Sequence, residues 1–242
     1  GSSQLLEPIV KLIVTPNTDY NKSIPNEDSE DVEFSELNVF ENNRYRGLDR
    51  AENGTRVYYG LRGGYYDSDY NLNYVIGQNY RLKEQAAPLN SGIEDNLSDI
   101  VGRISGQYKE VANLGYRFRL DEKSFTARRH EVDLNLNLKP VQFNIAYFKL
   151  DYDFTNETDN REEVSGNAKF KVYDDFGLVL GGTRNLQKNS NVNAIAGIIY
   201  EGDCTNLQAT LRRDYYDDRD AKSGTSFDFG LSLKNLGGIW GF

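Results

Sequence analysis

Few residues in this 242-residue chain belong to the types that covalent chemistry commonly uses. The chain has one histidine, His130, and one cysteine, Cys204, which lie far apart in the sequence. A nucleophile and its base must lie within hydrogen-bond reach of each other. Because these two residues are far apart in the sequence, they do not indicate an acyl-transfer site. The sequence therefore predicts a protein that is not an enzyme and needs no cofactor, although a serine–histidine pair stays open.

A calcium site is the nearest match among metal motifs. Residues 67–73 (DSDYNLN) resemble the first half of a calcium-binding loop. Such a loop requires glycine at its sixth position and an acidic residue at its twelfth, where this chain has Leu72 and Gln78. A turn of small polar residues explains the stretch better, and no metal site is predicted.

The elements that position these residues are β-strands, because apolar and polar residues alternate along much of the chain. Residues 113–120 (NLGYRFRL) and 130–138 (HEVDLNLNL) show the period of two that is typical of a strand with one apolar and one polar face. No stretch of comparable length has helical spacing, although a short helical turn near 36–40 is compatible with the sequence. The alternation predicts about twelve strands, at residues 7–14, 54–66, 71–83, 97–108, 111–121, 125–138, 140–152, 162–173, 176–187, 191–201, 204–216 and 224–236.

The connections between these strands fall into two alternating classes. One class consists of short turns, such as 108–110 and 139–140. The other class includes longer, acidic connections at 15–53, 84–96, 153–161 and 217–223, with shorter ones near 122–124 and 188–190. Short turns at one end of the strands and longer loops at the other are typical of an outer-membrane β-barrel.

Composition supports the barrel and excludes other classes. Only 38% of the residues are hydrophobic, and no apolar run is long enough for a membrane helix. The net charge of −9 argues against non-specific binding to nucleic acid, which needs a basic excess. The predicted strands are longer than the globular norm of about 5–6 residues, and tyrosines gather near their ends, as in aromatic girdles. We therefore predict an all-β fold, an antiparallel transmembrane β-barrel of about twelve strands, and a soluble β-sandwich is the alternative.

Distinctive motifs lie near both ends of the chain. Residues 6–10 (LEPIV), 24–29 (IPNEDS) and 43–56 (NRYRGLDRAENGTR) follow one another in order. Near the other end lie residues 199–204 (IYEGDC) and the strands from 211 to 238. This succession resembles the barrel of the LptD family, the lipopolysaccharide-assembly outer-membrane proteins, with the middle strands carrying the resemblance least.

The resemblance implies a component of the lipopolysaccharide translocon in the bacterial cell outer membrane. Family members have a periplasmic jelly-roll domain before the barrel, an LptE-like lipoprotein plug inside it, and an LptA-like periplasmic bridge that delivers lipopolysaccharide. Residues 1–242 would then be the C-terminal portion of the barrel, with 15–53 as a long extracellular loop. The sequence has no methionine, which agrees with such a truncation. Phe242, which follows an alternating strand, resembles the signal that the barrel-assembly machinery reads.

Cys204 has a role implied by the same resemblance. The order of the connections places it at a periplasmic turn, and family members use cysteines there for disulfides to the N-terminal periplasmic domain. The periplasm is oxidising, so such a disulfide would persist. Many relatives have two adjacent cysteines at this place, whereas Asp203 precedes Cys204 here, so the number of disulfides stays open. A free or buried thiol is the alternative.

The resemblance also implies that the last predicted strand, 224–236, borders a lateral gate through which lipopolysaccharide leaves the barrel. Glycine weakens strand interiors, which suits a seam that must open. The residues predicted for this gate strand are Phe227, Phe229, Gly230, Leu231 and Leu233.

Six basic residues are predicted to face the lumen. They are Arg117, Arg119, Arg129, Lys169, Lys171 and Arg212. Arginine and lysine pair with phosphate groups, which lipopolysaccharide carries. The simpler explanation is that these residues form ion pairs with Glu131, Asp133 and Asp228, or contact a plug protein.

Two other functions compete with the translocon. A self-contained, twelve-stranded outer-membrane channel for small solutes would have the same strand pattern. A soluble β-sandwich that binds a ligand would have the same alternation but the opposite face toward solvent.

Overall fold

The computed structural model of the chain describes residues 1–16, 33–45, 51–83, 87, 91–151, 161–216 and 222–233, together with the backbone of 237–240. Much of the predicted loop 15–53, including the charged motif at 46–50, lies outside the described residues. So do Phe242 and most of the predicted connections at 153–161 and 217–223.

The described residues form antiparallel β-strands, as the alternation predicts. Every predicted strand is present, with boundaries that differ by a few residues. The strands are β1 (Ser3–Ile13), β2 (Arg56–Tyr66), β3 (Tyr70–Arg81), β4 (Ile100–Tyr108), β5 (Ala112–Leu120), β6 (Ala127–Leu138), β7 (Val141–Leu150), β8 (Arg161–Tyr173), β9 (Phe176–Asn185), β10 (Ser190–Glu201), β11 (Thr205–Asp214), β12 (Gly224–Leu233) and β13 (Gly237–Trp240).

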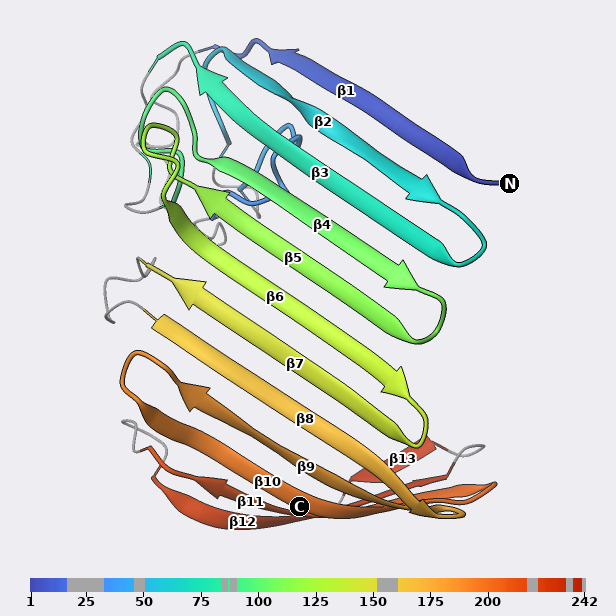
Figure 1. The fold of residues 1–242 in the computed structure, drawn as a ribbon. Helices are drawn as coiled ribbons and strands as arrows, with labels where there is room; N and C mark the ends of the chain where they lie inside the picture. Colours follow the sequence, from blue (N-terminus) through green and yellow to red (C-terminus); the bar gives the residue numbers. More distant parts are fainter. Residues whose placement is uncertain are drawn as a thin grey trace. The chain divides into compact units, whose positions relative to one another are not determined.

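The sheet has thirteen strands in strict sequence order, from β1 to β13 (Figure 1). The predicted all-β, antiparallel fold of barrel type is confirmed. Each strand pairs with its neighbours in the sequence, and β1 and β13 are the two edges of the order among the described residues. β13 is a short addition that the alternation did not predict; it pairs with residues 230–233 of β12.

The chain divides into two compact units. The first unit contains residues 1–109, 115–131 and 149–161, and the second contains 110–114, 132–148 and 162–242.

The helical turn considered near 36–40 is a pair of successive turns, in which Asn38 N–H donates to Ser35 O (3.2 Å) and Glu41 N–H to Asn38 O (3.1 Å). The described residues contain no helix with the length and apolarity that a membrane crossing requires.

The two faces of the strands in the first unit have opposite character. Tyr59, Ile76 and Ile104 project from one face, and each is more than a third exposed. Arg56 and Asn79 project from the other face and are buried. Over all described residues, ten buried residues are polar or charged and five are hydrophobic. A soluble sandwich would bury its apolar face instead, so this inverted pattern favours the barrel.

Segment 33–45 covers part of the polar face of the first unit. Phe34 and Val39 are buried in a small apolar cluster with Ile93 and Val101, against which Phe40 also packs. This is the only cluster of buried hydrophobic residues found among the described residues, and it lies on the polar side of the strands.

Two glycines make room for this segment. Gly60 in β2 and Gly77 in β3 lie opposite each other in the ladder. A Cβ atom at Gly60 would approach Phe40 Cζ to 2.7 Å, and one at Gly77 would approach it to 2.9 Å. The glycine pair therefore forms a flat patch that receives the ring of Phe40, which explains part of the glycine pattern in residues 60–77.

We predict that Gly77→Val loosens segment 33–45. A Cβ atom at this position would lie 2.8 Å from Val39 Cγ2 as well as 2.9 Å from Phe40 Cζ. Overpacking of this kind costs about 1–3 kcal/mol. An added protease should therefore cleave the segment roughly 5- to 150-fold faster in the full-length protein, as measured by mass spectrometry of the fragments.

Gly106→Val is the matched control, because a Cβ atom there meets only Leu72 Cδ1, at 3.8 Å. It should leave the cleavage rate unchanged. Equal acceleration in both variants would mean that valine disturbs the strands in general. No acceleration in Gly77→Val would contradict the packing of Phe40 and Val39 on the glycine patch.

Candidate functional site

The polar face of the first unit is held to segment 33–45 by basic side chains that reach across it. Lys11 in β1 donates from Nζ to the carbonyl oxygen of Phe40 (2.7 Å). Arg44, which is 5% exposed, forms an ion pair with Glu52 and donates to it from Nε (3.0 Å). Arg56, buried in β2, donates to the carbonyl oxygen of Glu52 (3.1 Å). Arg56 also donates from Nη2 to the carbonyl oxygen of Asn42, so the backbone acceptors of Phe40 and Asn42 in the segment both have partners.

An ion-pair network continues on β5 and β6. Glu33 pairs with Arg119 Nη1 (2.8 Å) and with Arg129 Nη1 (2.6 Å). Arg129 also pairs with Glu131, which in turn pairs with Arg117 (2.6 Å). A cavity of about 340 Å³ lies beside this network and is lined by Glu33, Arg117 and Arg129 among other residues. Because the lining carries both signs of charge, the cavity does not favour an anion or a cation.

Three of the predicted lumen-facing basic residues, Arg117, Arg119 and Arg129, thus lie together. The simpler explanation, pairing with Glu131, applies to Arg117 and Arg129. Glu33 is the partner that the sequence analysis did not identify, because it lies in a loop whose return onto the strands has no sequence pattern.

A second charged group lies where β4 begins and β5 ends. Asp99, which is 1% exposed, contacts Arg119 Nε (3.4 Å) and Arg128 Nη1 (3.2 Å) through Oδ2. Its Oδ1 is buried and has no hydrogen-bond partner among the described residues. Burial raises the pKa of Asp99 to about 7, against the opposing effect of the two arginines. Hydrogen bonds from the backbone and side chain of Ser124 hold the pKa of Asp121 well below its usual range.

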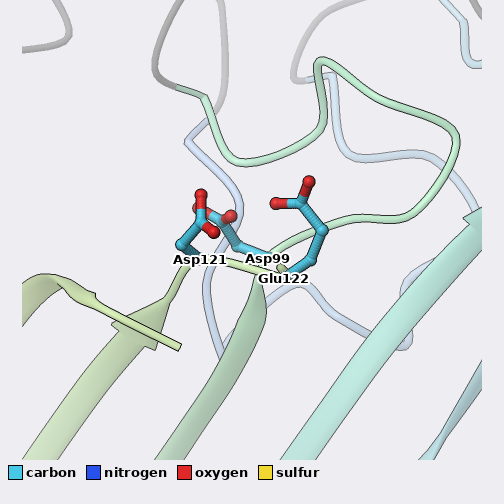
Figure 2. Close-up of side chains that lie close together, drawn as sticks. All are labelled: Asp99, Asp121 and Glu122. Carbon is cyan, nitrogen blue, oxygen red and sulfur yellow. The ribbon is translucent and has the colours of Figure 1, made fainter. Parts of the chain in front are cut away.

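Asp99, Asp121 and Glu122 bring their carboxylates together, as Figure 2 shows. One oxygen from each lies within 4.8 Å of the others, which is a donor set that a divalent cation accepts. Lys123 Nζ already lies 3.2 Å from Glu122, and Arg128 pairs with Asp121, so positive charge is present without a metal. The sequence analysis missed this group. The strand order could have revealed it, because the start of β4 and the end of the antiparallel β5 lie at the same end of the strands.

The other predicted basic residues lie in the second unit. Lys169 in β8 pairs with Glu201, and Arg212 in β11 pairs with Asp214 (3.0 Å). Lys171 is exposed and, with Lys169, lines a cavity of about 390 Å³ near the turn between β6 and β7. These residues do not join the ion-pair network of the first unit.

The two side chains best suited to covalent chemistry, His130 and Cys204, do not form a catalytic group within the described part of the chain. His130 Nδ1 lies 2.7 Å from the hydroxyl of Tyr116 rather than near a serine. Cys204 is exposed and free in the turn between β10 and β11, and this chain has no second cysteine to pair with it.

The calcium-like stretch at 67–73 contains a hairpin turn. Asp67 N–H donates to Tyr70 O (2.8 Å), and Asp69 pairs with Lys109 of the next turn (3.2 Å). Residues 67–69 thus lie in the turn, and residues 70–73 begin β3.

The predicted gate strand is β12. Phe227 and Phe229 are 66% and 50% exposed and lie on its apolar face. Gly230 pairs with Gln208 on one side and with Trp240 of β13 on the other. Among the described residues, β12 therefore has a partner along its whole length on the β11 side and only at its end on the other side.

The chain is similar in sequence to proteins of one known family. The family described as "LptD: LPS transport system D" matches residues 1–179. The LPS-assembly protein LptD of Pseudoalteromonas translucida is 22% identical over 95% of this chain and 31% of its own length. The LptD proteins of Escherichia coli O1:K1 and Vibrio cholerae are 23% and 24% identical over 100% and 62% of this chain. The chain spans about a third or less of the length of these relatives.

We predict that Glu33→Gln destabilises the first unit. The substitution removes the negative charge that faces both Arg119 and Arg129, and Arg119 is 2% exposed. Leaving a buried charged group short of a partner costs roughly 1–3 kcal/mol. The free energy of unfolding should fall by that amount, measured by urea titration of the full-length protein in lipid vesicles.

Glu7→Gln is the control for this measurement. Glu7 pairs with Arg62 at 2.9 Å, but both side chains are largely exposed, so the loss should stay below about 1 kcal/mol. If Glu33→Gln cost no more than Glu7→Gln, the ion-pair network would not hold the segment.

Proposed function

Because this chain belongs to the LptD family of lipopolysaccharide transport proteins, we propose that it forms part of the outer-membrane β-barrel that inserts lipopolysaccharide into the outer leaflet. The observation that carries the proposal is the family match over residues 1–179. The inverted polarity of the strands supports it, because apolar side chains project outward where a soluble protein would bury them.

Hydrogen bonding supports a larger barrel. A bilayer offers no partners to the backbone groups of an unpaired strand edge, so strands cross membranes in closed barrels. The strand order leaves β1 and β13 as separate edges among the described residues. In the proposal, further strands pair with these edges and complete the barrel, with this chain as its C-terminal portion and 15–53 as a long extracellular loop.

The polar face would then line the lumen, and the apolar face would contact lipid. Tyr59 and Tyr80, which are 38% and 43% exposed, would lie among the lipid-facing aromatic residues. The ion pairs of Glu33 with Arg119 and Arg129 would lie inside the barrel, where charges are sheltered from hydrocarbon.

The lateral gate would be bordered by β12. Among the residues that the structure describes, its far edge pairs with β13 over residues 230–233, and in the proposal residues 224–229 pair with the first strand of the barrel. A seam with few hydrogen bonds opens more readily than a full ladder. Lipopolysaccharide would pass between these strands, beside Phe227 and Phe229.

The partners in the proposal are lipopolysaccharide, an LptE-like plug, an LptA-like bridge that acts through an N-terminal domain, and the barrel-assembly machinery. Cys204 would form a disulfide with that domain. Its exposure in the β10–β11 turn supports this role, because an exposed thiol in an oxidising compartment is accessible to a partner.

Depletion of the full-length protein tests the function. In its own cells, we expect newly made lipopolysaccharide to stop reaching the surface and to accumulate in the inner membrane. Pulse labelling followed by membrane fractionation measures this distribution, and re-expression of the protein provides the control. Normal lipopolysaccharide distribution combined with altered uptake of small solutes would instead support a self-contained channel.

Non-reducing electrophoresis tests the role of Cys204. The Cys204→Ser variant of the full-length protein should lose an oxidised form that the parent protein shows, because serine preserves the size of the side chain without the thiol. Mass spectrometry after alkylation gives an independent measurement. Complete alkylation of Cys204 in the unreduced parent protein would refute the disulfide.

A further inference from the structure

Three carboxylates meet at one end of the strands of the first unit, where two loops come together (Figure 2). Asp99 ends the loop that leads from β3 into β4, and Asp121 and Glu122 directly follow β5. Asp99 N–H donates to the carbonyl oxygen of Gly92 (2.8 Å). Asp121 Oδ1 accepts hydrogen bonds from the backbone N–H (2.7 Å) and the hydroxyl (2.8 Å) of Ser124. The backbone at Asp99 and the carboxylate of Asp121 are therefore held in place by their own loops.

Asp99 is the innermost member of this carboxylate group. Its side chain is 1% exposed, and its Oδ2 contacts Arg119 (3.4 Å) and Arg128 (3.2 Å). Its Oδ1 is equally buried and has no hydrogen-bond partner among the residues that the structure describes. Burying a charged oxygen without a partner is costly, and a hydrogen-bond donor or a cation removes that cost.

Like charges are in contact at the same place. The carboxyl group of Glu122 lies against that of Asp99 and, on the solvent side, against that of Asp95. The Glu122 side chain is only 6% exposed, so little water screens these contacts. Two carboxylates in contact repel each other unless a proton or a cation lies between them. A proton neutralises one charge, whereas a divalent cation neutralises two and reaches Asp121 as well.

The basic side chains beside the group do not supply enough positive charge. Each of the three is shared between two carboxylates. The shared contacts are Lys123 with Asp95 and Glu122, Arg128 with Asp99 and Asp121, and Arg119 with Asp99 and Glu33. Negative charge therefore exceeds positive charge around the three carboxylates, which is the condition that favours binding of a cation.

Calcium suits this group better than magnesium. One oxygen from each carboxylate lies within 4.8 Å of the others, and Ca²⁺ binds such oxygens at about 2.3–2.6 Å in a flexible geometry, with water completing its shell. Mg²⁺ requires a nearly ideal octahedron with bonds of about 2.0–2.1 Å. Because Ser124 and Arg128 already fix the carboxylate of Asp121, the group adapts less readily to the stricter geometry.

We propose that Asp99, Asp121 and Glu122 bind one Ca²⁺ ion. The ion is structural: it joins the loop before β4 to the turn between β5 and β6, with the buried Oδ1 of Asp99 as its innermost ligand. All three residues belong to the first unit. The inference goes beyond the proposed function, and its test requires no lipopolysaccharide.

Equilibrium dialysis with radioactive Ca²⁺ tests the site on the full-length protein in detergent, after a chelator has removed bound metal. Glu122→Gln removes one ligand charge while it keeps the size of the side chain. We expect this variant to bind Ca²⁺ at the site at least ten-fold more weakly than the parent protein. Displacing Ca²⁺ from the parent protein should require a large excess of Mg²⁺, and displacement at equal concentrations would overturn the preference for Ca²⁺.

Glu7→Gln is the matched control, because Glu7 forms an exposed ion pair with Arg62 (2.9 Å) in the same unit. It should leave Ca²⁺ binding unchanged. Equal binding by the parent protein and Glu122→Gln would overturn the site, since the ions would then be held elsewhere. The site would also be overturned if the parent protein bound no Ca²⁺ and Glu122→Gln raised the unfolding temperature, because the carboxylates would then share a proton.

Protease protection measures the site in the parent protein without a substitution. If the ion joins the two loops, excess Ca²⁺ should slow cleavage within residues 91–99 and 121–126. The effect should reach up to about 100-fold when Ca²⁺ is at 100 times its Kd. Na⁺ at the same ionic strength should not protect, because it only screens surface charge. Mass spectrometry of the fragments gives both rates, and equal protection by the two ions, or none by either, would overturn the proposal.

Discussion

The pairing of Glu33 with Arg119 and Arg129 is the interaction on which the rest of the first unit depends. Arg119 is almost fully buried on β5, and a buried guanidinium requires anionic partners close by. Asp99 supplies one at 3.4 Å and Glu33 the other at 2.8 Å. Because Glu33 comes from a loop, the charge on the strand determines where that loop returns. Phe34, next to Glu33, then enters the only apolar cluster found among the described residues.

The same constraint explains why the glycines of β2 and β3 lie where they do. Once Glu33 holds the start of the segment and Lys11 holds the carbonyl of Phe40, the ring of Phe40 must lie against the sheet. Side chains at positions 60 and 77 would occupy the space of that ring. Ion pairing, backbone hydrogen bonding and the glycine patch therefore act on the same segment, each through different atoms.

The second unit satisfies its polar face in another way. Asn144 donates from Nδ2 to Asn135 Oδ1, Lys169 pairs with Glu201, and Arg212 pairs with Asp214. The first unit thus has a polar face that segment 33–45 covers in part, whereas in the second unit side chains of the strands pair with one another. Both are compatible with the interior of a lipopolysaccharide transport barrel.

Much of the fold could be predicted from the sequence, because side chains on a strand alternate between two faces with a period that residue types reveal directly. The strands and the shared face of Arg117, Arg119 and Arg129 follow from that period. The motifs at residues 6–10 and 43–56 identified the family, which strand periodicity alone does not do.

Only the tertiary structure decided which residues meet across long separations. Glu33 contacts Arg129 across 96 positions, and Asp99 meets Asp121 because two antiparallel strands bring their ends together. Loop residues have no period that predicts their return, and ion pairs have no sequence spacing when they join a loop to a strand.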